Sequence, residues 1–586
     1  MNNRLSPPLQ KRLSYASLIV IAGLLGYFII VLHIAWLNNG GTGSELPYNL
    51  VAWAFISAIC AVFWLVRPSA IKLTITPLSS SLFIGAALMS LPLLWSPSPM
   101  TLYHALPRIG GLWAGMIFFL TIRQVTFTGK YKLILFYALI LAGVTEALIV
   151  LFEIYAPTAW LPLIWQKLTL KYGRYGVGVF QQVNVTASFL AVSLTACLFT
   201  FCATSTSFAN TRLESIRRIS LAAMIVLLSA VLTLLCSRIG WLAGICSVGI
   251  TWLIVNFSQF KNESRHQILV LLLPFAGEML GYHFMHNTIG QALAAHSGSN
   301  HQRILTLYQT LLFASKHPLL GYGAGTYEGY YQAFMARLLD GNLSKELMDH
   351  PHNEVLYQYS EGGIVALAGV LIWCVLYIRL WFKTRNFIQK AALLTILPFI
   401  LHTQVEYPFY YSAPHWIIFL VFLRLADDEK TTSSTVMKTN IKRLAIQALL
   451  FAVTLYGSII SIQANHNSEI MMKLESNEIA DANAITHLHI SWLQRFRYQK
   501  DRNLIRLLEF QQTHDPAHLL LFTEENEKII AVTPDPELYS NQIAILNYLH
   551  DYKAANEWLL RARYTLPWES QFRPIRSVKN QSISRD

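Results

Sequence analysis

The feature that most restricts the fold of this chain is a series of apolar runs, each about 20 residues long, between residues 15 and 463. A helix of about 20 apolar residues is long enough to cross the hydrocarbon core of a bilayer. Charged residues make up only 13% of the chain, whereas soluble domains carry about 25%. The sequence therefore predicts an all-α, polytopic protein that lies in a lipid bilayer. We expect about thirteen spans, at residues 15–37, 49–66, 79–96, 107–122, 133–155, 185–204, 220–236, 240–257, 267–285, 355–381, 391–404, 412–425 and 443–463.

Lys and Arg gather in every second loop between these runs, the distribution that sets orientation in membrane proteins. We therefore interpret the net charge of +13 as a topology signal and not as a surface for nucleic acid. If the basic loops are cytoplasmic, a loop at 156–184, a long loop at 286–354 and the tail beyond 465 lie outside. This pattern predicts a bacterial inner (cytoplasmic) membrane protein with a membrane domain at 1–464. Its loop at 286–354 would be catalytic and periplasmic, and residues 465–586 would form a periplasmic helical domain.

The tail differs in composition from the rest of the chain, since it is charged, poor in glycine and helical in period. The segment from Leu538 to Pro567 predicts two amphipathic helices joined by a short turn, similar to one tetratricopeptide unit. A single unit is compatible with a repeat array. It is equally compatible with a small helical domain that packs on the membrane region or receives a protein partner.

Titratable side chains gather in one stretch, "MDHPHNEVLYQYSEGG", from Met348 to Gly363. Pro351 prevents a helix from starting before it, and Asn353 is a good N-cap for the span that follows. The helix N-terminus favours an anion such as a phosphate, and a histidine beside it can accept a proton from a hydroxyl. A histidine that only caps the helix is the alternative. The spacing of His350 and His352 does not fit a metal site, so we expect no metal and no cofactor.

Further candidates lie at the predicted outer ends of other spans. Arg238 and Arg303 are suited to bind the two phosphates of a pyrophosphate in bidentate fashion, although snorkelling or a solvated charge also explains them. The glycine-rich segment at 316–331 resembles a phosphate loop but lacks its Lys-Ser/Thr, and taken alone it is better explained as a turn with close backbone packing. Glu406 is an ionisable residue in an apolar setting, which indicates a functional site, or else it pairs with an arginine such as Arg238. Arg174, Gln182 and Asn184 lie just before a span in the first outer loop.

These motifs, in this order, resemble the bacterial O-antigen ligase and polymerase superfamily. The similar parts are a Ser-Arg at the outer end of a span, the loop Arg303, "HPLLGYGAG" and "HPHNEVLYQYSEGG". "GVFQQVN" and "EYPFYY" are similar to its pilin-type O-oligosaccharyltransferase branch, and the helical tail fits that branch. The resemblance covers most of residues 170–425. This chain has Gln182-Val183-Asn184 where the branch usually has Gln-Pro-Asn, which leaves the placement of Gln182 open.

The resemblance implies metal-independent transfer of a preassembled glycan from an undecaprenyl-pyrophosphate carrier to Ser or Thr hydroxyls of periplasmic proteins such as pilin. His352 matches the essential histidine of the family and would act as the base or orienting group, with Glu406 and Tyr407 as further catalytic residues. Arg238 and Arg303 would hold the pyrophosphate. The remaining residues expected to bind substrate are Arg174, Gln182, Asn184, His350 and Asn353.

Other activities remain open at this point. An O-antigen ligase or a polymerase that acts on a glycan or lipid acceptor would share the same chemistry. A flippase for lipid-linked glycans would also have many spans, but transporters place polar groups near the middle of the bilayer, often in repeated halves. An envelope-assembly scaffold would explain the tail but not the histidine site.

Overall fold

A computed structural model describes residues 7–38, 40–257, 267–285, 297–338, 342, 346–427, 441–476 and 483–573. The described residues form helices and no β-strand, as predicted. Within these described ranges, ten helical segments are long and apolar enough to cross a membrane. Their bounds are Leu9–His33, Pro47–Val66, Pro77–Trp95, Pro99–Arg123, Gly129–Tyr155, Val183–Cys202, Thr211–Leu234, Arg238–Phe257, Glu354–Lys383 and Ile441–Glu475. The prediction of an all-α, multi-pass membrane protein is confirmed. The basic loop segments at 258–266 and 428–440 lie outside the described residues.

Three of the thirteen predicted spans are shorter than a full crossing. They are α10 (Leu269–His283), the pair α15 (Phe387–Thr395) and α16 (Leu397–His402), and α18 (Ala413–Ala426). Pro398 lies in the first turn of α16, where it interrupts the helix that the apolar pattern predicted. All 14 residues of α18 are buried, so this short helix is surrounded by protein, which satisfies polar groups that lipid cannot.

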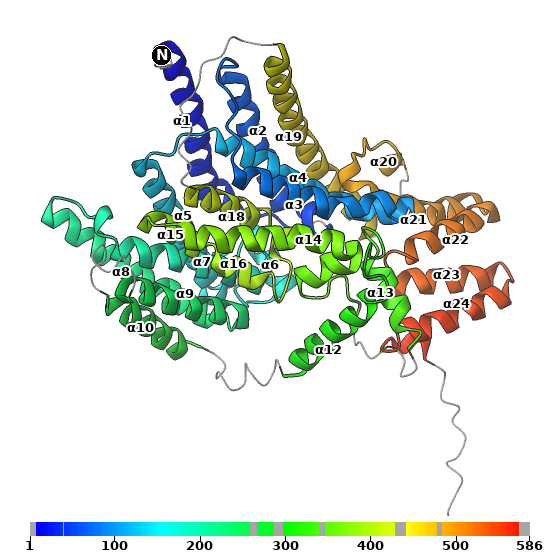
Figure 1. Ribbon diagram of the computed structural model, residues 1–586. Helices are drawn as coiled ribbons and strands as arrows, with labels where there is room; N and C mark the ends of the chain where they lie inside the picture. Colours follow the sequence, from blue (N-terminus) through cyan, green and yellow to red (C-terminus); the bar gives the residue numbers. More distant parts are fainter. Residues whose placement is uncertain are drawn as a thin grey trace, which may run out of the picture.

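The long helices form a bundle around α7 (Val183–Cys202), which is buried along its entire candidate span. It packs against α5 (Gly129–Tyr155), α8 (Thr211–Leu234) and α9 (Arg238–Phe257). At the side of this bundle, α1 (Pro7–Ile29), α2 (Pro47–Val66) and α19 (Ile441–Glu475) lie next to one another (Figure 1).

The chain before α14 (Glu354–Lys383) contains α12 (Ser297–Ala314), α13 (Tyr327–Met335) and the glycine-rich segment between them. This segment packs against the start of α14, which is kinked at Gly363 with φ of +55°. The backbone N–H of Gly323 donates to Glu361 O over 2.8 Å, and a Cβ on Gly363 would lie 2.4 Å from the Leu319 backbone. The Glu361 side chain also accepts from Gly325 N, over 3.0 Å. The glycines thus allow a close backbone contact that fixes α14.

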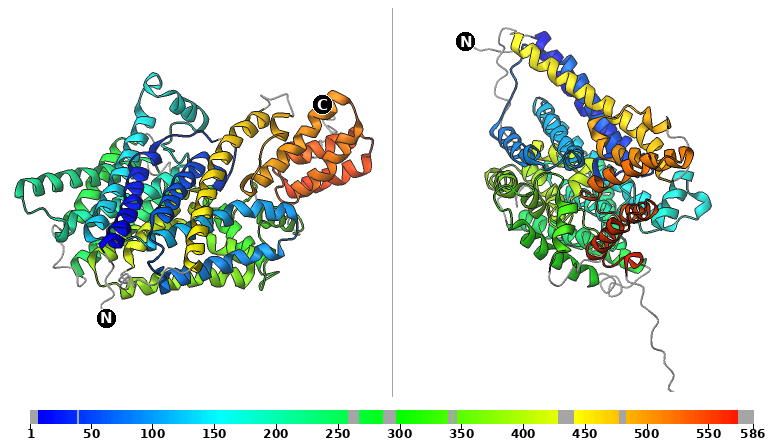
Figure 2. Two further views of the ribbon diagram at one scale, coloured as in Figure 1. Left: turned by 90° about the horizontal axis from the view of Figure 1, so that it is seen from above. Right: turned by 90° about the vertical axis from the view of Figure 1, so that its right-hand side faces the viewer.

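The tail consists of α21 (Arg495–Thr513), α22 (Pro516–Ile530), α23 (Pro536–Tyr548) and α24 (Tyr552–Thr565), on one flank of the molecule (Figure 2). The last two are the amphipathic pair that the sequence predicted. The apolar core of the tail includes Met100 from α4 (Pro99–Arg123) and is covered by Leu347 of the long loop. Asn342 of that loop donates to Thr565 O over 2.9 Å. The tail is therefore packed on the loop, and α19 continues across the predicted boundary at 464/465 to Glu475.

Reporter fusions test the predicted orientation. Fusions at Asn300 and Gln511 are both expected to report the outer side, because the basic loops lie on the opposite side in the thirteen-span arrangement. Paired fluorescent and alkaline phosphatase fusions measure this directly. A cytoplasmic signal from either position contradicts that arrangement.

Candidate active site

The site forms where the long loop enters α14. The Asn353 side chain caps this helix by accepting from Leu356 N over 3.0 Å. Glu354 N donates to Thr403 O over 2.9 Å, and Asn353 Nδ2 donates to Gln404 O over 3.2 Å. These bonds fasten the start of α14 to the turn that follows α16. Segments about fifty residues apart in sequence, around His352 and Glu406, are thereby brought together.

His352 occupies a strained position at this junction. Its φ of +54° lies in the left-handed region, which costs a non-glycine residue about 1–2 kcal/mol. Burial lowers the pKa of the His352 imidazole, and the positive charge of Arg303 adds to this effect, while Glu406 opposes it. Among the described residues, its buried Nδ1 has no hydrogen-bond partner. The lowered pKa favours the neutral imidazole at neutral pH, which is the form that a base requires.

His350 is placed differently, because its side chain is covered. Its ring lies against Tyr357 and Tyr407, with centroid distances of 4.5 and 4.1 Å. Its Nδ1 accepts from His352 N over 3.0 Å, so it fixes the backbone of the neighbouring histidine. Tyr407 OH donates to Asp349 Oδ2 over 2.9 Å. Burial and the Asp349 carboxylate raise the Tyr407 pKa well above its usual range, so the phenol remains protonated.

Glu406 is the centre of the polar cluster and is 8% exposed. It accepts from Asn184 Nδ2 over 2.6 Å and from Gln182 Nε2 over 3.4 Å. Its Oε1 lies 3.4 Å from an Arg303 guanidinium nitrogen. Burial raises the Glu406 pKa, but the hydrogen bonds from His402 and Asn184 and the charge of Arg303 outweigh burial and hold it below its usual range. Glu406 is therefore a carboxylate at neutral pH.

The two arginines expected to bind pyrophosphate lie near this carboxylate. Arg303 pairs with Glu406, the arginine pairing that the sequence had suggested for Arg238. Arg238 begins α9 and is close enough to Arg303 and Glu406 to interact with both charges. Ser237 beside it donates to Asn184 Oδ1 over 2.8 Å, which connects α9 to α7.

Arg174 lies outside the cluster. Its guanidinium donates to the carbonyl of Ala156 over 2.6 Å and to Thr158 Oγ1 over 2.8 Å. It also donates to Glu153 O and Ile154 O, so it caps the carbonyl end of α5. The structure thus brings together His352, Glu406, Arg303, Gln182 and Asn184, with Arg238 nearby, and places Arg174 apart from them.

The sequence interpretation did not single out His402 or the ion pair between Arg108 and Glu361. His402 Nε2 lies 3.0 Å from Glu406 Oε2, and its position four residues earlier in the chain was the available signal. Arg108 of α4 forms an ion pair with Glu361 and lies 4.3 Å from the centroid of the Tyr357 ring. No local sequence pattern indicated this second group, because the two charged partners are 253 residues apart.

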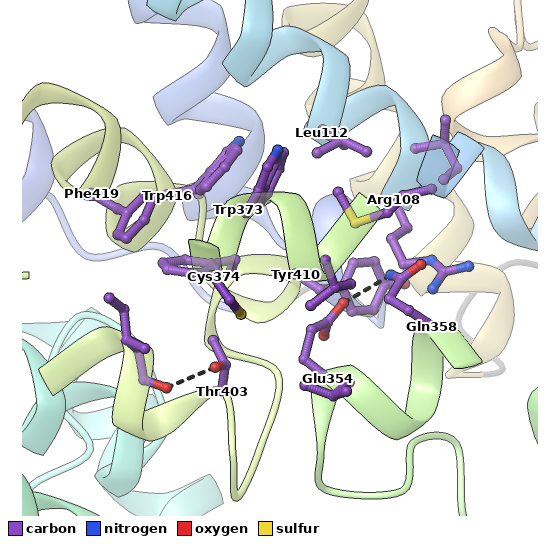
Figure 3. Close-up of a pocket in the computed structure, with 18 of the residues that line it drawn as sticks. Arg108, Leu112, Glu354, Gln358, Trp373, Cys374, Thr403, Tyr410, Trp416 and Phe419 are labelled. Atoms are coloured by element: carbon purple, nitrogen blue, oxygen red, sulfur yellow. Dashed lines mark hydrogen bonds between the residues drawn. The ribbon is translucent and has the colours of Figure 1, made fainter. Parts of the chain in front are cut away.

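A pocket of about 330 Å³ adjoins the site (Figure 3). Its apolar wall is aromatic and comes from α14 and α18, and its polar part lies beside the start of α14. The aromatic residues include Trp373, Trp416 and Phe419, and the polar residues include Arg108, Glu354, Gln358, Thr403 and Gln404. Glu354 is two residues from His352. A ligand with an apolar chain and a charged head fits this division.

Acid dependence of the reaction follows from the surroundings of His352. Its pKa is lowered, so activity is expected to fall with decreasing pH only below about 6.5, the ordinary value for histidine. Arg303→Gln removes a charge that lowers this pKa and should move the acid limb to higher pH. Glu406→Gln removes a charge that raises it and should move the limb to lower pH. Profiles of kcat/KM against pH measure both shifts, and shifts in the same direction contradict His352 as the titrating group.

Two family models match this chain. Residues 223–371 match the model described as "O-Antigen ligase". Residues 390–580 match the model described as "Virulence factor membrane-bound polymerase, C-terminal". No curated protein gives a significant match. The two matches support placement in the O-antigen ligase and polymerase superfamily, and with it a membrane glycan ligase or polymerase type of activity.

Proposed function

We propose that this protein is a membrane O-oligosaccharyltransferase. It transfers a preassembled glycan from a polyprenyl-pyrophosphate carrier, such as undecaprenyl pyrophosphate, to Ser or Thr hydroxyls of proteins outside the cytoplasm. In a bacterium the acceptor is a periplasmic protein of the pilin kind, and the reaction takes place on the periplasmic face of the inner membrane.

One observation carries the proposal, namely the neutral His352 held at the start of α14. An acceptor hydroxyl within reach of the imidazole loses its proton to the ring as the new glycosidic bond forms. The bond between the sugar and the pyrophosphate breaks at the same time, and the polyprenyl pyrophosphate leaves as an anion. The leaving group already carries stable negative charge, so the chain's residues need only position the reactants and stabilise developing charge.

The arginines and the pocket support a lipid-linked donor. Arg303 and Arg238 provide two positive charges beside His352, and bidentate arginine contacts suit phosphate oxygens. The aromatic pocket provides an apolar wall for the first isoprene units of the carrier. Its polar part, at Glu354 and Gln358, lies at the end next to the reacting groups.

A second candidate is a polymerase or ligase with a glycan or lipid acceptor. The observation that favours it is the match of residues 390–580 to the C-terminal part of a membrane-bound polymerase. The histidine and the arginines would have the same roles, and only the acceptor hydroxyl would differ. The protein acceptor is favoured by the "GVFQQVN" and "EYPFYY" segments, whose Gln182, Asn184 and Glu406 side chains lie in contact.

Mass spectrometry of envelope proteins separates the two candidates. Cells with and without this chain are compared, and we expect one or more peptides to lose a glycan on Ser or Thr when the chain is absent. Loss of long-chain polysaccharide with an unchanged protein glycan pattern would instead identify the polymerase or ligase activity.

A further inference from the structure

A line of buried hydrogen bonds runs from Glu406 into the bundle. His402 Nε2 lies 3.0 Å from Glu406 Oε2, and His402 Nδ1 lies 2.9 Å from Ser188 Oγ. Ser188 Oγ lies 3.1 Å from His415 Nε2, and His415 Nδ1 lies 2.8 Å from Ser412 Oγ. All four side chains beyond Glu406 are fully buried. They connect α7, α16 and α18, and we call them the relay.

The donors and acceptors of the relay can be assigned so that its hydrogen bonds follow one another in one direction. The Val185 carbonyl, which can only accept, lies 3.1 Å from His415 Nε2, so this nitrogen carries the hydrogen. His415 Nδ1 is then bare and accepts from Ser412. Glu406 is ionised and also only accepts, so His402 Nε2 carries the hydrogen, and Ser188 Oγ is in place to donate to His402 Nδ1. Ser188 Oγ also lies 3.0 Å from Val185 O, which can accept the same hydrogen. When the Ser188 hydroxyl turns to His402 Nδ1 instead, the bonds from Ser412 through His415, Ser188 and His402 point toward Glu406.

The residues around the relay are apolar, so an unpaired polar side chain in the relay would lower the stability of the fold. His415 lies among aromatic rings, with centroid distances of 5.1 Å to Phe180 and 4.4 Å to Phe399. A polar group buried among apolar neighbours is unfavourable unless it is hydrogen-bonded. Core packing alone would be served equally by apolar side chains at these positions. The outer end of the relay, however, is a carboxylate that faces the reaction site.

We propose that the relay of Ser412, His415, Ser188 and His402 is a positioning device that keeps Glu406 ionised and fixed beside Arg303 and His352. Among the described residues, the charged or titratable groups that face Glu406 are His402, Arg303 of α12, Arg238 of α9, His352 before α14, and the phenols of Tyr407 and Tyr411. The fixed negative charge orients the Arg303 guanidinium and stabilises the imidazolium that forms when His352 accepts a proton. This role in transfer rests on the proposed function, whereas the ionisation of Glu406 is measurable without substrate.

Infrared titration of the purified protein tests the relay directly. The band of the protonated Glu406 carboxyl is assigned by its loss in Glu406→Gln. Ser188→Ala removes the donor to His402 Nδ1, so the ring no longer favours the tautomer that donates to Glu406. We expect Glu406 to protonate at a pH higher by roughly one unit, the size that corresponds to one lost charge-assisted hydrogen bond.

Ser193→Ala is the matched control, because Ser193 is also a buried serine of α7 and donates to Leu139 O outside the relay. This control should titrate like the unaltered protein.

His415→Phe provides a second variant if Ser188→Ala does not fold, since phenylalanine suits the aromatic surroundings. The shift of the Glu406 titration in His415→Phe should have the same sign and be smaller. The relay is wrong if Glu406 titrates at an unchanged pH in whichever of these two variants folds. It is also wrong if Ser193→Ala shifts the Glu406 titration by the same amount. Absence of transfer by the unaltered protein refutes the proposed function but leaves this titration unaffected.

Discussion

His352→Ala is expected to abolish glycan transfer, with a loss of roughly a hundredfold or more in kcat. In the proposed reaction the imidazole is the group that accepts or orients the acceptor proton. The lowered pKa of His352 keeps this base available at neutral pH. Transfer is measured in membranes with labelled lipid-linked donor, at equal protein levels.

His352→Gly tests whether lost transfer results from the missing imidazole and not from misfolding. Glycine adopts a φ of +54° without strain, so this variant should be at least as stable as the unaltered protein and still be inactive. His350→Ala should reduce transfer less than His352→Ala, because His350 is covered by two tyrosines. Normal transfer by His352→Gly, or an inactive His350→Ala beside an active His352→Ala, contradicts the assignment.

Arg303→Ala is expected to lower kcat/KM for the donor about 10- to 100-fold, which corresponds to about 1.4–2.7 kcal/mol of lost transition-state stabilisation. Arg238→Ala should have an effect in the same direction. Arg303→Lys should remain impaired, because lysine retains the charge but not the bidentate fork. Transfer rates at limiting and saturating donor concentration measure this effect.

Arg212→Ala is the matched control for the arginines. Arg212 is an exposed residue in the first turn of α8, whereas the proposed clamp lies at the start of α9 and on α12. Its loss should leave donor use unchanged. If Arg238→Ala and Arg303→Ala both transfer glycan normally at limiting donor concentration, these arginines are structural and the clamp is wrong.

The sequence predicted the helices well because apolar run length carries most of that information. It did not distinguish lipid-facing spans from buried core helices such as α18, since hydropathy is the same for both. Asn353 was predictable as a cap from local pattern alone. The connection of His402 to Ser188 was not, because the two residues are 214 positions apart and only packing of α16 on α7 joins them. Local motifs therefore indicate where a site lies, while its hydrogen bonds require the fold.

The most direct test of the central claim is transfer by the purified protein in liposomes with two substrates. One is a defined polyprenyl-pyrophosphate oligosaccharide and the other is a peptide with a single Ser or Thr acceptor. Mass spectrometry should detect the intact glycan on the peptide and an equal amount of released polyprenyl pyrophosphate, and neither product with His352→Gly. Equal product yields with the unaltered protein and with His352→Gly would contradict the central claim. The claim would also be contradicted if the unaltered protein did not consume the donor with peptide, glycan or lipid acceptors.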